Sequence, residues 1–189
     1  GRDALTLEVK DLAHQVGYVF QDPESMFATL TVEDEIAFGP ENLRLEREII
    51  RQTVEEMLEM ADLRAFRGNL VWNLSGGQVQ KLGLAAILAM RPELILLDEP
   101  TANLDPVATR SVHELVRGLR DQGMTVLLVT RELDDFLAEA DQLLVLEDGR
   151  ITASGSPAQV LLEDGDRMNE ELGIWLPETT EIGLALRRA

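Results

Sequence analysis

Two short segments in the middle of the chain carry residue types suited to binding an anion and a cation. The first is Ser75-Gly76-Gly77-Gln78, and the second, Asp98-Glu99, begins 23 positions after the serine. A serine that caps a helix, two glycines that let a ligand approach the backbone, and the positive end of the helix dipole together favour an anion. On its own, Ser-Gly-Gly is a common flexible turn. Leu74 before it and Gln80-Lys81 after it make the string much more specific.

The two acids follow a continuously apolar run. Leu94–Leu97 is expected to form a short strand of a parallel sheet that is covered on both faces. Because α/β proteins bind ligands at the C-terminal ends of such strands, Asp98 is a candidate magnesium ligand, directly or through water. Glu99 is a candidate to orient or deprotonate an attacking water. The alternative is an acidic helix cap ahead of Pro100.

The composition limits the class of protein. A chain of 189 residues with 45% hydrophobic content can bury one sizeable core and is most simply a single domain. The formal charge of −18 argues against a surface that follows a phosphate backbone, so no nucleic-acid partner is expected. The chain has no cysteine, which excludes disulfides and fits a cytosolic protein. No apolar run approaches the roughly 18 residues that a membrane-spanning helix needs.

Strand and helix patterns alternate along the chain, which predicts an α/β fold with a largely parallel sheet. Strands are expected at 5–9, 16–20, 94–97 and 125–129, and a strand, a tight turn and a second strand over 143–153. Helices are expected over 46–61, from 75 to just before Pro92, around 112–119 and around 133–140. The strand at 125–129 is expected to be buried.

These residues resemble the motifs of a known family. The string 74–78 resembles the signature motif of ATP-binding-cassette (ABC) ATPases, and Asp98-Glu99 resembles their Walker B motif. Gln21 stands where the family has its Q-loop glutamine, and the segment 102–105 resembles the D-loop. The resemblance implies a P-loop NTPase-like α/β core with a helical signature subdomain at about 22–91. It implies a truncated ABC ATPase domain at 1–164 and a C-terminal tail at 165–189.

In that family two ATPase subunits pair head to tail, and each ATP lies between them. The resemblance therefore implies ATP and Mg²⁺ as cofactors and a second ATPase subunit, identical or different, as a partner. It implies a magnesium ligand in Asp98 and in Gln21, and a catalytic role for Gln21 and Glu99. It also implies nucleotide contacts from the residues that one subunit offers to the other: Ser75, Gly76, Gly77, Gln78 and Asp105.

A narrower likeness, carried by the segments 20–24, 31–39 and 172–186, is to the energy-coupling-factor (ECF) group of ABC importers. That group powers the uptake of vitamins, cobalt or nickel. The resemblance implies a subunit at the cytoplasmic face of the cell membrane, with a transmembrane coupling subunit near Gln21–Phe27. A soluble ABC ATPase of DNA repair or translation is less favoured, because the stretch from Gln21 to Ser75 leaves no room for a long coiled coil.

Two departures from the family bear on hydrolysis. The only lysines, Lys10 and Lys81, do not end a glycine-rich loop, so the phosphate-cradling Walker A loop, its strand and its helix are expected to be missing from residues 1–189. In the family this strand is expected to lie beside the Walker B strand, so its absence should expose strand edges. Without the loop, the chain is expected to be inactive alone.

The second departure is Arg131, which stands where the family has its switch histidine. An imidazole can accept as well as donate a hydrogen bond, whereas a guanidinium is always charged and only donates. Arg131 is therefore a candidate to clamp a γ-phosphate, or to pair with Glu99 and weaken it as a base, or simply to be an exposed helix-start residue. The main functional alternative is a non-hydrolysing module that supplies the signature motif to a partner's ATP site.

Overall fold

The computed structural model describes residues 12, 15–133, 136–177, 180 and 183. The chain divides into two compact units, Gly1–Val129 and Thr130–Ala189, and each is described by itself. The predicted strand at 5–9 lies outside the described residues. The predicted boundary between residues 164 and 165 lies inside helix α6 (Pro157–Glu170). Where the domain ends along the chain stays a prediction.

A parallel sheet organises the first unit. Its strands are β1 (Val16–Val19), β2 (Leu94–Asp98) and β3 (Thr125–Val129), in the order β1-β2-β3, which confirms the predicted parallel sheet. The central strand β2 is paired along both edges. The expectation that a phosphate-loop strand lies beside the strand ending in Asp98 is therefore wrong, because β1 and β3 already occupy both of its neighbouring positions.

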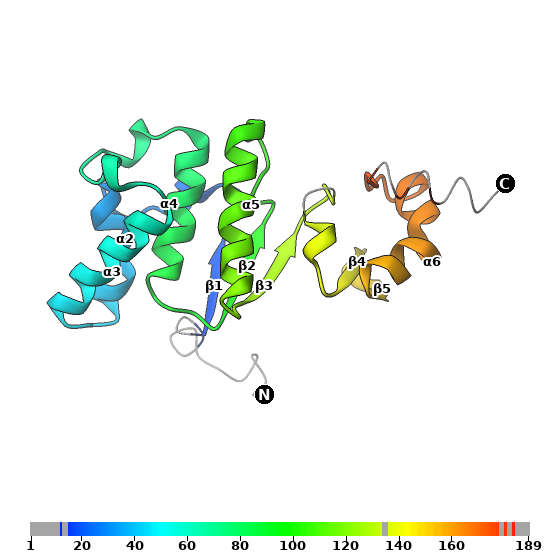
Figure 1. Ribbon diagram of the computed structural model, residues 1–189, viewed down its shortest axis with the longest axis horizontal. Coiled ribbons are helices and arrows are strands. Elements are labelled where there is room, and N and C mark those ends of the chain that lie inside the picture. The colour runs from blue at the N-terminus through cyan, green and yellow to red at the C-terminus, as the bar shows by residue number, and fades with distance from the viewer. Residues whose placement is uncertain (1–11, 13–14, 134–135, 178–179, 181–182, 184–189) are drawn as a thin grey trace. The chain divides into compact units, whose positions relative to one another are not determined.

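The two faces of this sheet differ in their cover. Helices α4 (Gly76–Leu88) and α5 (Pro106–Asp121) lie over one face, as Figure 1 shows. On that face Val19, Ile95 and Leu97 are buried, and Val126 and Leu128 of β3 are partly buried. The opposite face, termed the open face, alternates with them along the strands and carries Val16, Tyr18, Leu96, Leu127 and Val129.

Side chains on the open face are partly exposed within this unit. Tyr18 is 37% exposed and Leu127 is 41% exposed. The expectations of a sheet covered on both faces and of a buried strand at 125–129 are therefore wrong for the part of the chain that the structure describes. The physical reason is that an apolar strand is stabilised when other segments pack on both of its faces, but the strand's own sequence does not show which segments do so.

The helical part of the first unit precedes and includes α4. It contains α2 (Val32–Asn42) and α3 (Arg47–Met60), with 3₁₀ turns at Pro23–Met26, Arg64–Phe66 and Val71–Asn73. Its helices share one buried apolar cluster, centred on Ile36, Leu58, Leu63 and Leu82. The predicted helices at 46–61 and 75–91 are confirmed as α3 and α4.

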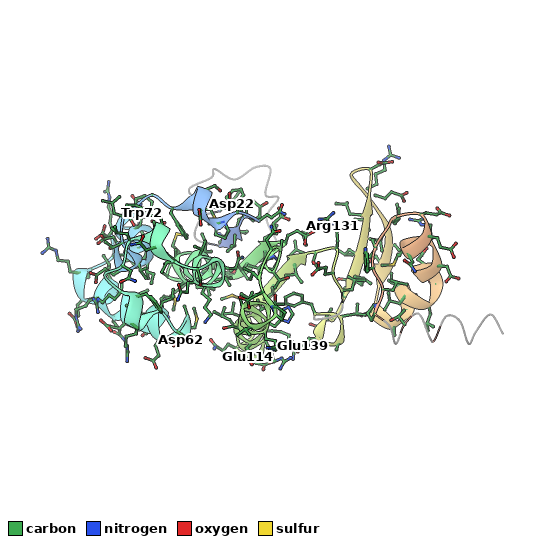
Figure 2. All side chains as sticks on the ribbon, turned by 90° about the horizontal axis from the view of Figure 1, so that it is seen from above. Asp22, Asp62, Trp72, Glu114, Arg131 and Glu139 are labelled. Atoms are coloured by element: carbon green, nitrogen blue, oxygen red, sulfur yellow. The ribbon has the colours of Figure 1, made fainter. Side chains whose placement is uncertain are left out.

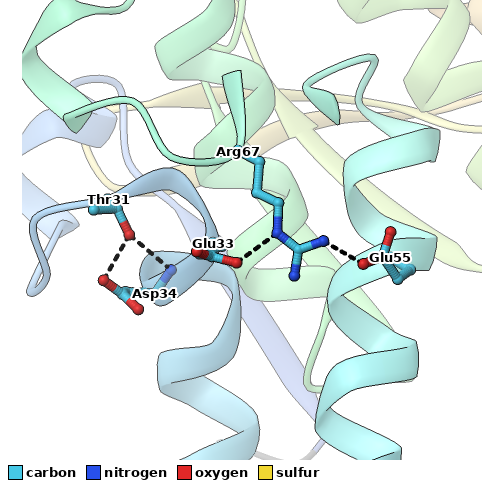
Figure 3. A network of polar contacts seen from close by, with 5 residues as sticks. All are labelled: Thr31, Glu33, Asp34, Glu55 and Arg67. Carbon is cyan, nitrogen blue, oxygen red and sulfur yellow. Dashed lines mark hydrogen bonds and ion pairs between the residues drawn. The ribbon is translucent and has the colours of Figure 1, made fainter. Parts of the chain in front are cut away.

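A network of polar contacts ties this helical part together (Figure 3). Arg67 donates hydrogen bonds to Glu33 on α2 and to Glu55 on α3. The bond from Arg67 lowers the pKa of Glu55. Thr31 caps α2, because its hydroxyl accepts from the Asp34 N–H at 3.3 Å and donates to the Asp34 carboxylate at 2.6 Å. The network joins two helices to the loop that leads to the signature segment.

The second unit is built on a β-hairpin. Strands β4 (Leu143–Glu147) and β5 (Arg150–Gly155) are antiparallel, and Asp148 and Gly149 between them have φ of 47° and 74°. Two left-handed residues suit a tight hairpin turn, so the predicted strand, turn and strand are confirmed. Helix α6 contributes Val160 and Met168 to the buried cluster of this unit.

The helix predicted around 133–140 is wrong for the described residues there. They contain only a 3₁₀ turn at Leu137–Glu139, after which Ala140 is extended. Leu137 in this short turn and Leu133 before it both join the apolar cluster of the second unit, so their apolar spacing does not require an α-helix. Among the described residues, no helix combines the length and the apolar character that crossing a bilayer requires.

Candidate functional site

The two acids lie at the C-terminal end of the central strand, the edge at which parallel sheets bind ligands. Asp98 is the last residue of β2 and is paired in register with Val129 of β3. The Glu99 N–H donates to the Val129 carbonyl at 2.8 Å. Glu99 has a φ of 46°, in the left-handed region that residues other than glycine rarely adopt. Such strained residues cluster at functional sites.

Tyr18 contacts Asp98 on the open face. Its hydroxyl donates to Asp98 Oδ2 at 3.0 Å, and this hydrogen bond is the largest cause of the raised pKa of Tyr18. The Tyr18 ring lies against Phe20, with ring centroids 4.3 Å apart. Sequence reasoning missed Tyr18. Its alternation with Val19 places it on one face of β1, but which strand lies beside β1 is not readable from that pattern.

Gln21 lies at the same edge of the sheet. It is exposed and follows the end of β1 by two residues. Because β1 and β2 are parallel, their C-terminal ends meet at one edge, so the structure brings the segment of Gln21 to the side of the sheet that carries Asp98. Its predicted roles as a magnesium ligand and as a catalytic residue stay predictions.

The residues at this edge suit Mg²⁺ if they supply only part of its ligands and the substrate phosphates and water supply the rest. Within the described residues, no group of three or more His, Cys, Asp or Glu side chains could hold a metal ion. Mg²⁺ takes oxygen ligands, keeps several waters, and is commonly held by one or two carboxylates together with substrate phosphates. A half-buried Asp98 carboxylate at a strand end fits one such ligand.

The signature segment forms the start of α4, as predicted. Ser75 is the N-cap, and its N–H donates to Gln78 Oε1 at 2.8 Å, one half of a capping box. Gly77 packs against α5: a Cβ added there would lie 2.7 Å from the Cβ of Ala108. A Cβ added at Gly76 would lie 3.6 Å from Leu104, an ordinary contact. The second glycine is thus needed for the close approach of the two helices.

Asp105 begins the neighbouring helix. Its Oδ1 accepts from the N–H groups of Val107 and Ala108 at 2.8 and 2.9 Å, so it is the N-cap of α5. The first turn of α5 is also the one that packs against Gly77. The structure therefore brings Asp105 and the signature glycines together. Their contacts with nucleotide stay a prediction.

Arg131 is the remaining candidate site residue. It is exposed, follows the end of β3 by two residues, and belongs to the second unit (Figure 2). The Thr130 hydroxyl accepts from the Glu132 N–H at 3.1 Å, so the chain turns here rather than starting a helix. The interpretation of Arg131 as a helix-start residue is therefore wrong. Its pairing with Glu99 or with a phosphate stays a prediction.

The parallel sheet with paired acids at its edge, and a helix that begins with two glycines, define a nucleotide-binding α/β domain. Residues 1–102 match the family model of the ABC transporter. The chain therefore belongs to the ABC transporter family of ATP-binding proteins. A solved structure, CbiO1 from Clostridium perfringens, described as part of the ABC transporter complex CbiONQ, matches with a TM-score of 0.75 and 28% identity over 92% of this chain and 68% of that one. The resemblance to ABC ATPases is confirmed, and so is the fold class.

Relatives with assigned names include ECF proteins. The chain is 37% identical over 179 residues to the energy-coupling factor transporter ATP-binding protein EcfA1 of Caldanaerobacter subterraneus, covering 94% of this chain and 64% of the relative. It is 40% identical over 180 residues to EcfA2 of Latilactobacillus sakei, covering 94% and 61%. Of two longer Methanosarcina relatives it spans 30% and 32%. The chain is thus shorter than the relatives that it matches.

Proposed function

We propose that this chain is the ATP-hydrolysing subunit of an ABC importer of ECF type, which couples hydrolysis to the uptake of a small solute, a vitamin or a transition-metal ion. The observation that carries the proposal is the placement of Asp98 and Glu99 at the edge of the parallel sheet, in the same unit as the capped, glycine-led start of α4. The names of the relatives EcfA1 and EcfA2 support the importer type.

The residues divide the chemistry between two ATP sites. In the chain's own site, Asp98 supplies a carboxylate oxygen to Mg²⁺, and Glu99 orients and deprotonates the attacking water. Magnesium, when bound with ATP, neutralises charge that develops on the phosphates. In the partner's site, the backbone N–H groups at the start of α4 face the phosphates, helped by the positive end of the helix dipole.

The test is calorimetric titration of Mg-ATP, followed by steady-state hydrolysis, in the chain expressed with any residues that precede Gly1 in its gene. Glu99→Gln is expected to keep ATP binding and to lower turnover by about 10²–10⁴-fold, the usual contribution of a general base. Glu93→Gln, an exposed acid just before β2, is the matched control and should leave both unchanged. Equal turnover in Glu99→Gln and wild type would contradict the proposal.

A second candidate function is a non-hydrolysing subunit that completes a partner's ATP site. Arg131 in place of a histidine favours it, because a guanidinium cannot accept a hydrogen bond. In this case the wild type, expressed with any residues that precede Gly1 in its gene, supports hydrolysis only when mixed with an ATPase partner that has its own switch histidine, and Arg131→His is expected to raise hydrolysis by the chain's own site. Normal turnover by the wild type without such a partner would rule this candidate out.

A surface at the Q-loop segment is a candidate docking site for the proposed transmembrane coupling subunit. A cavity of about 180 Å³ is lined mainly by apolar side chains, among them Met26, Phe27, Phe38 and Met90. Phe38 is 43% exposed. An apolar hollow lined in part by Met26 and Phe27 supports the docking of a short apolar helix of a membrane protein. Such docking would hold this subunit at the cytoplasmic face of the membrane.

This docking is tested by co-purification with the transmembrane subunit. Phe38→Asp is expected to abolish co-purification and leave Mg-ATP binding unchanged. Trp72→Asp is the control, because Trp72 is exposed at the surface of the helical part and does not line the cavity (Figure 2). Equal loss in both variants would mean that the contact is not made at this cavity.

A further inference from the structure

We propose that Tyr18 is a positioning residue that holds the Asp98 carboxylate in the orientation in which it binds Mg²⁺. This inference rests on the proposed function, because it takes Asp98 as a metal ligand. Tyr18 itself makes no contact with metal or nucleotide in the proposal. It acts only through the carboxylate.

The strand register makes this contact possible. Tyr18 is paired with Leu96, so Asp98 lies two residues further along the neighbouring strand and on the same face. Parallel strands lie about 4.8 Å apart and rise about 3.3 Å per residue, so a side chain must reach diagonally across this spacing. The phenol does so, and its oxygen lies 3.0 Å from Asp98 Oδ2. A shorter side chain at position 18 would not reach.

The bond engages one carboxylate oxygen from one side. Tyr18 donates to Oδ2, which leaves Oδ1 outside this hydrogen bond. A phenol is protonated at neutral pH and so remains a donor. The bond therefore restricts rotation of the carboxylate about its last side-chain bond. Without it, a half-buried carboxylate at a strand end samples other orientations.

The ring of Tyr18 is in turn held by Phe20. The two rings are tilted by 45° with centroids 4.3 Å apart, and Phe20 directly precedes Gln21. One aromatic pair thus connects the carboxylate of Asp98 to the start of the Q-loop segment. A change in the position of that segment is expected to reach Asp98 through these two rings.

Residues that hydrogen-bond to metal-ligating carboxylates typically change metal affinity or activity by about 10–100-fold when they are removed. The chosen variant is Tyr18→Phe, which removes the hydroxyl and keeps the ring contact with Phe20. The control is Phe20→Leu, which weakens the ring contact and keeps the hydroxyl. Thermal melts of both variants check that the fold is intact.

The experiment uses the chain expressed with any residues that precede Gly1 in its gene. It measures Mn²⁺ binding in the presence of ATP, with free Mn²⁺ counted by electron paramagnetic resonance, and the Mg²⁺ concentration for half-maximal hydrolysis. Tyr18→Phe is expected to raise both the Mn²⁺ dissociation constant and this Mg²⁺ concentration by about tenfold or more, while turnover at saturating Mg²⁺ changes much less. In an Asp98→Asn background, Tyr18→Phe is expected to have no further effect on Mn²⁺ binding.

The possible outcomes separate the two proposals. Metal-dependent ATP binding by the wild type, with an unchanged metal requirement in Tyr18→Phe, would overturn the role of Tyr18 and leave the proposed function standing. Equal weakening of ATP binding with and without metal would show a merely structural role and overturn it too. No metal-dependent ATP binding by the wild type would overturn both proposals.

Discussion

The helical side of the first unit and the open face of its sheet are built differently. On the helical side, α2 to α5 and the covered sheet face bury apolar side chains against one another, and the start of α4 is held by a cap and by contact with α5. On the open face, Tyr18 and Leu127 are partly exposed, and Tyr18 donates a hydrogen bond to Asp98. The chain thus preorganises by itself the signature segment proposed to serve a partner's ATP. The edge proposed to bind its own ATP is less fully enclosed.

The largest expected effect separates the two sides directly. Ile95→Ala, on the covered face, is expected to lower the free energy of unfolding by about 2–5 kcal/mol through the cavity that it leaves. Leu127→Ala, on the open face, is expected to cost about 1 kcal/mol or less, since its side chain is already partly in water. Urea denaturation measures both. Equal losses would show that the open face is covered in solution, for example by self-association.

The second prediction sharpens the description of the signature end. Gly77→Ala is expected to lower the free energy of unfolding by about 1–3 kcal/mol, because its methyl group would meet Ala108 at 2.7 Å. Gly76→Ala is the matched control, since its nearest neighbour would be an ordinary contact at 3.6 Å. Thermal denaturation of the two variants compares them. A Gly77→Ala variant as stable as Gly76→Ala would mean that the helices move apart freely.

The third prediction concerns charges on the helical side. Arg67→Ala removes the centre of a network that joins α2 and α3, and it is expected to lower the melting temperature by a few degrees. Arg51→Ala removes a pair with Glu48, in which both side chains are mostly exposed, and should leave the melting temperature nearly unchanged. Differential scanning calorimetry measures both variants. A larger drop in melting temperature for Arg51→Ala than for Arg67→Ala would contradict the prediction that the Arg67 network contributes more to stability.

The smallest expected effect is on the pH dependence of stability. The pKa of Glu55 is lowered from its ordinary 4.5 by the hydrogen bond from Arg67. A carboxyl whose pKa is lower in the folded state stabilises the fold above its unfolded pKa, and this contribution is lost as the pH falls through the folded value. Below about pH 4.5, the free energy of unfolding of Glu55→Gln is therefore expected to fall slightly less steeply with decreasing pH than that of the wild type. Urea titrations at pH 7 and pH 3.5 measure the difference, and an unchanged slope would contradict it.

Much of the helical side and of the sheet could be predicted from the sequence. Apolar spacing predicted α3 and α5, the signature string followed by an apolar run up to Pro92 predicted α4, and short apolar runs predicted β1, β2 and β3. Two helices were missed although signals were present. Thr31 with Asp34 is a capping pair before α2, but Pro40 within that helix argues against a helix. Ser156-Pro157 begins α6 with a cap and a proline in the first turn.

The candidate site divides in the same way. Motif spacing found the acids, the signature glycines and Gln21, because each belongs to a string of neighbouring residues. Tyr18 was not found, because its partner Asp98 is 80 positions away and the contact depends on strand register. The partial exposure of Leu127 was not found either, since it depends on what packs against the sheet and not on the strand itself.

The contact between Gly77 and Ala108 also limits how this sequence can diverge. A side chain larger than alanine at position 108 would need space that only a shift of α5 could provide, because the helices already meet there. Substitutions at the two positions are therefore expected to be linked, and position 108 should accept only small residues while Gly77 is kept. Saturation mutagenesis at 108, scored by protein abundance in cells, would show a narrow set of tolerated residues. The signature segment thus limits the size of the side chain that the first turn of α5 can carry.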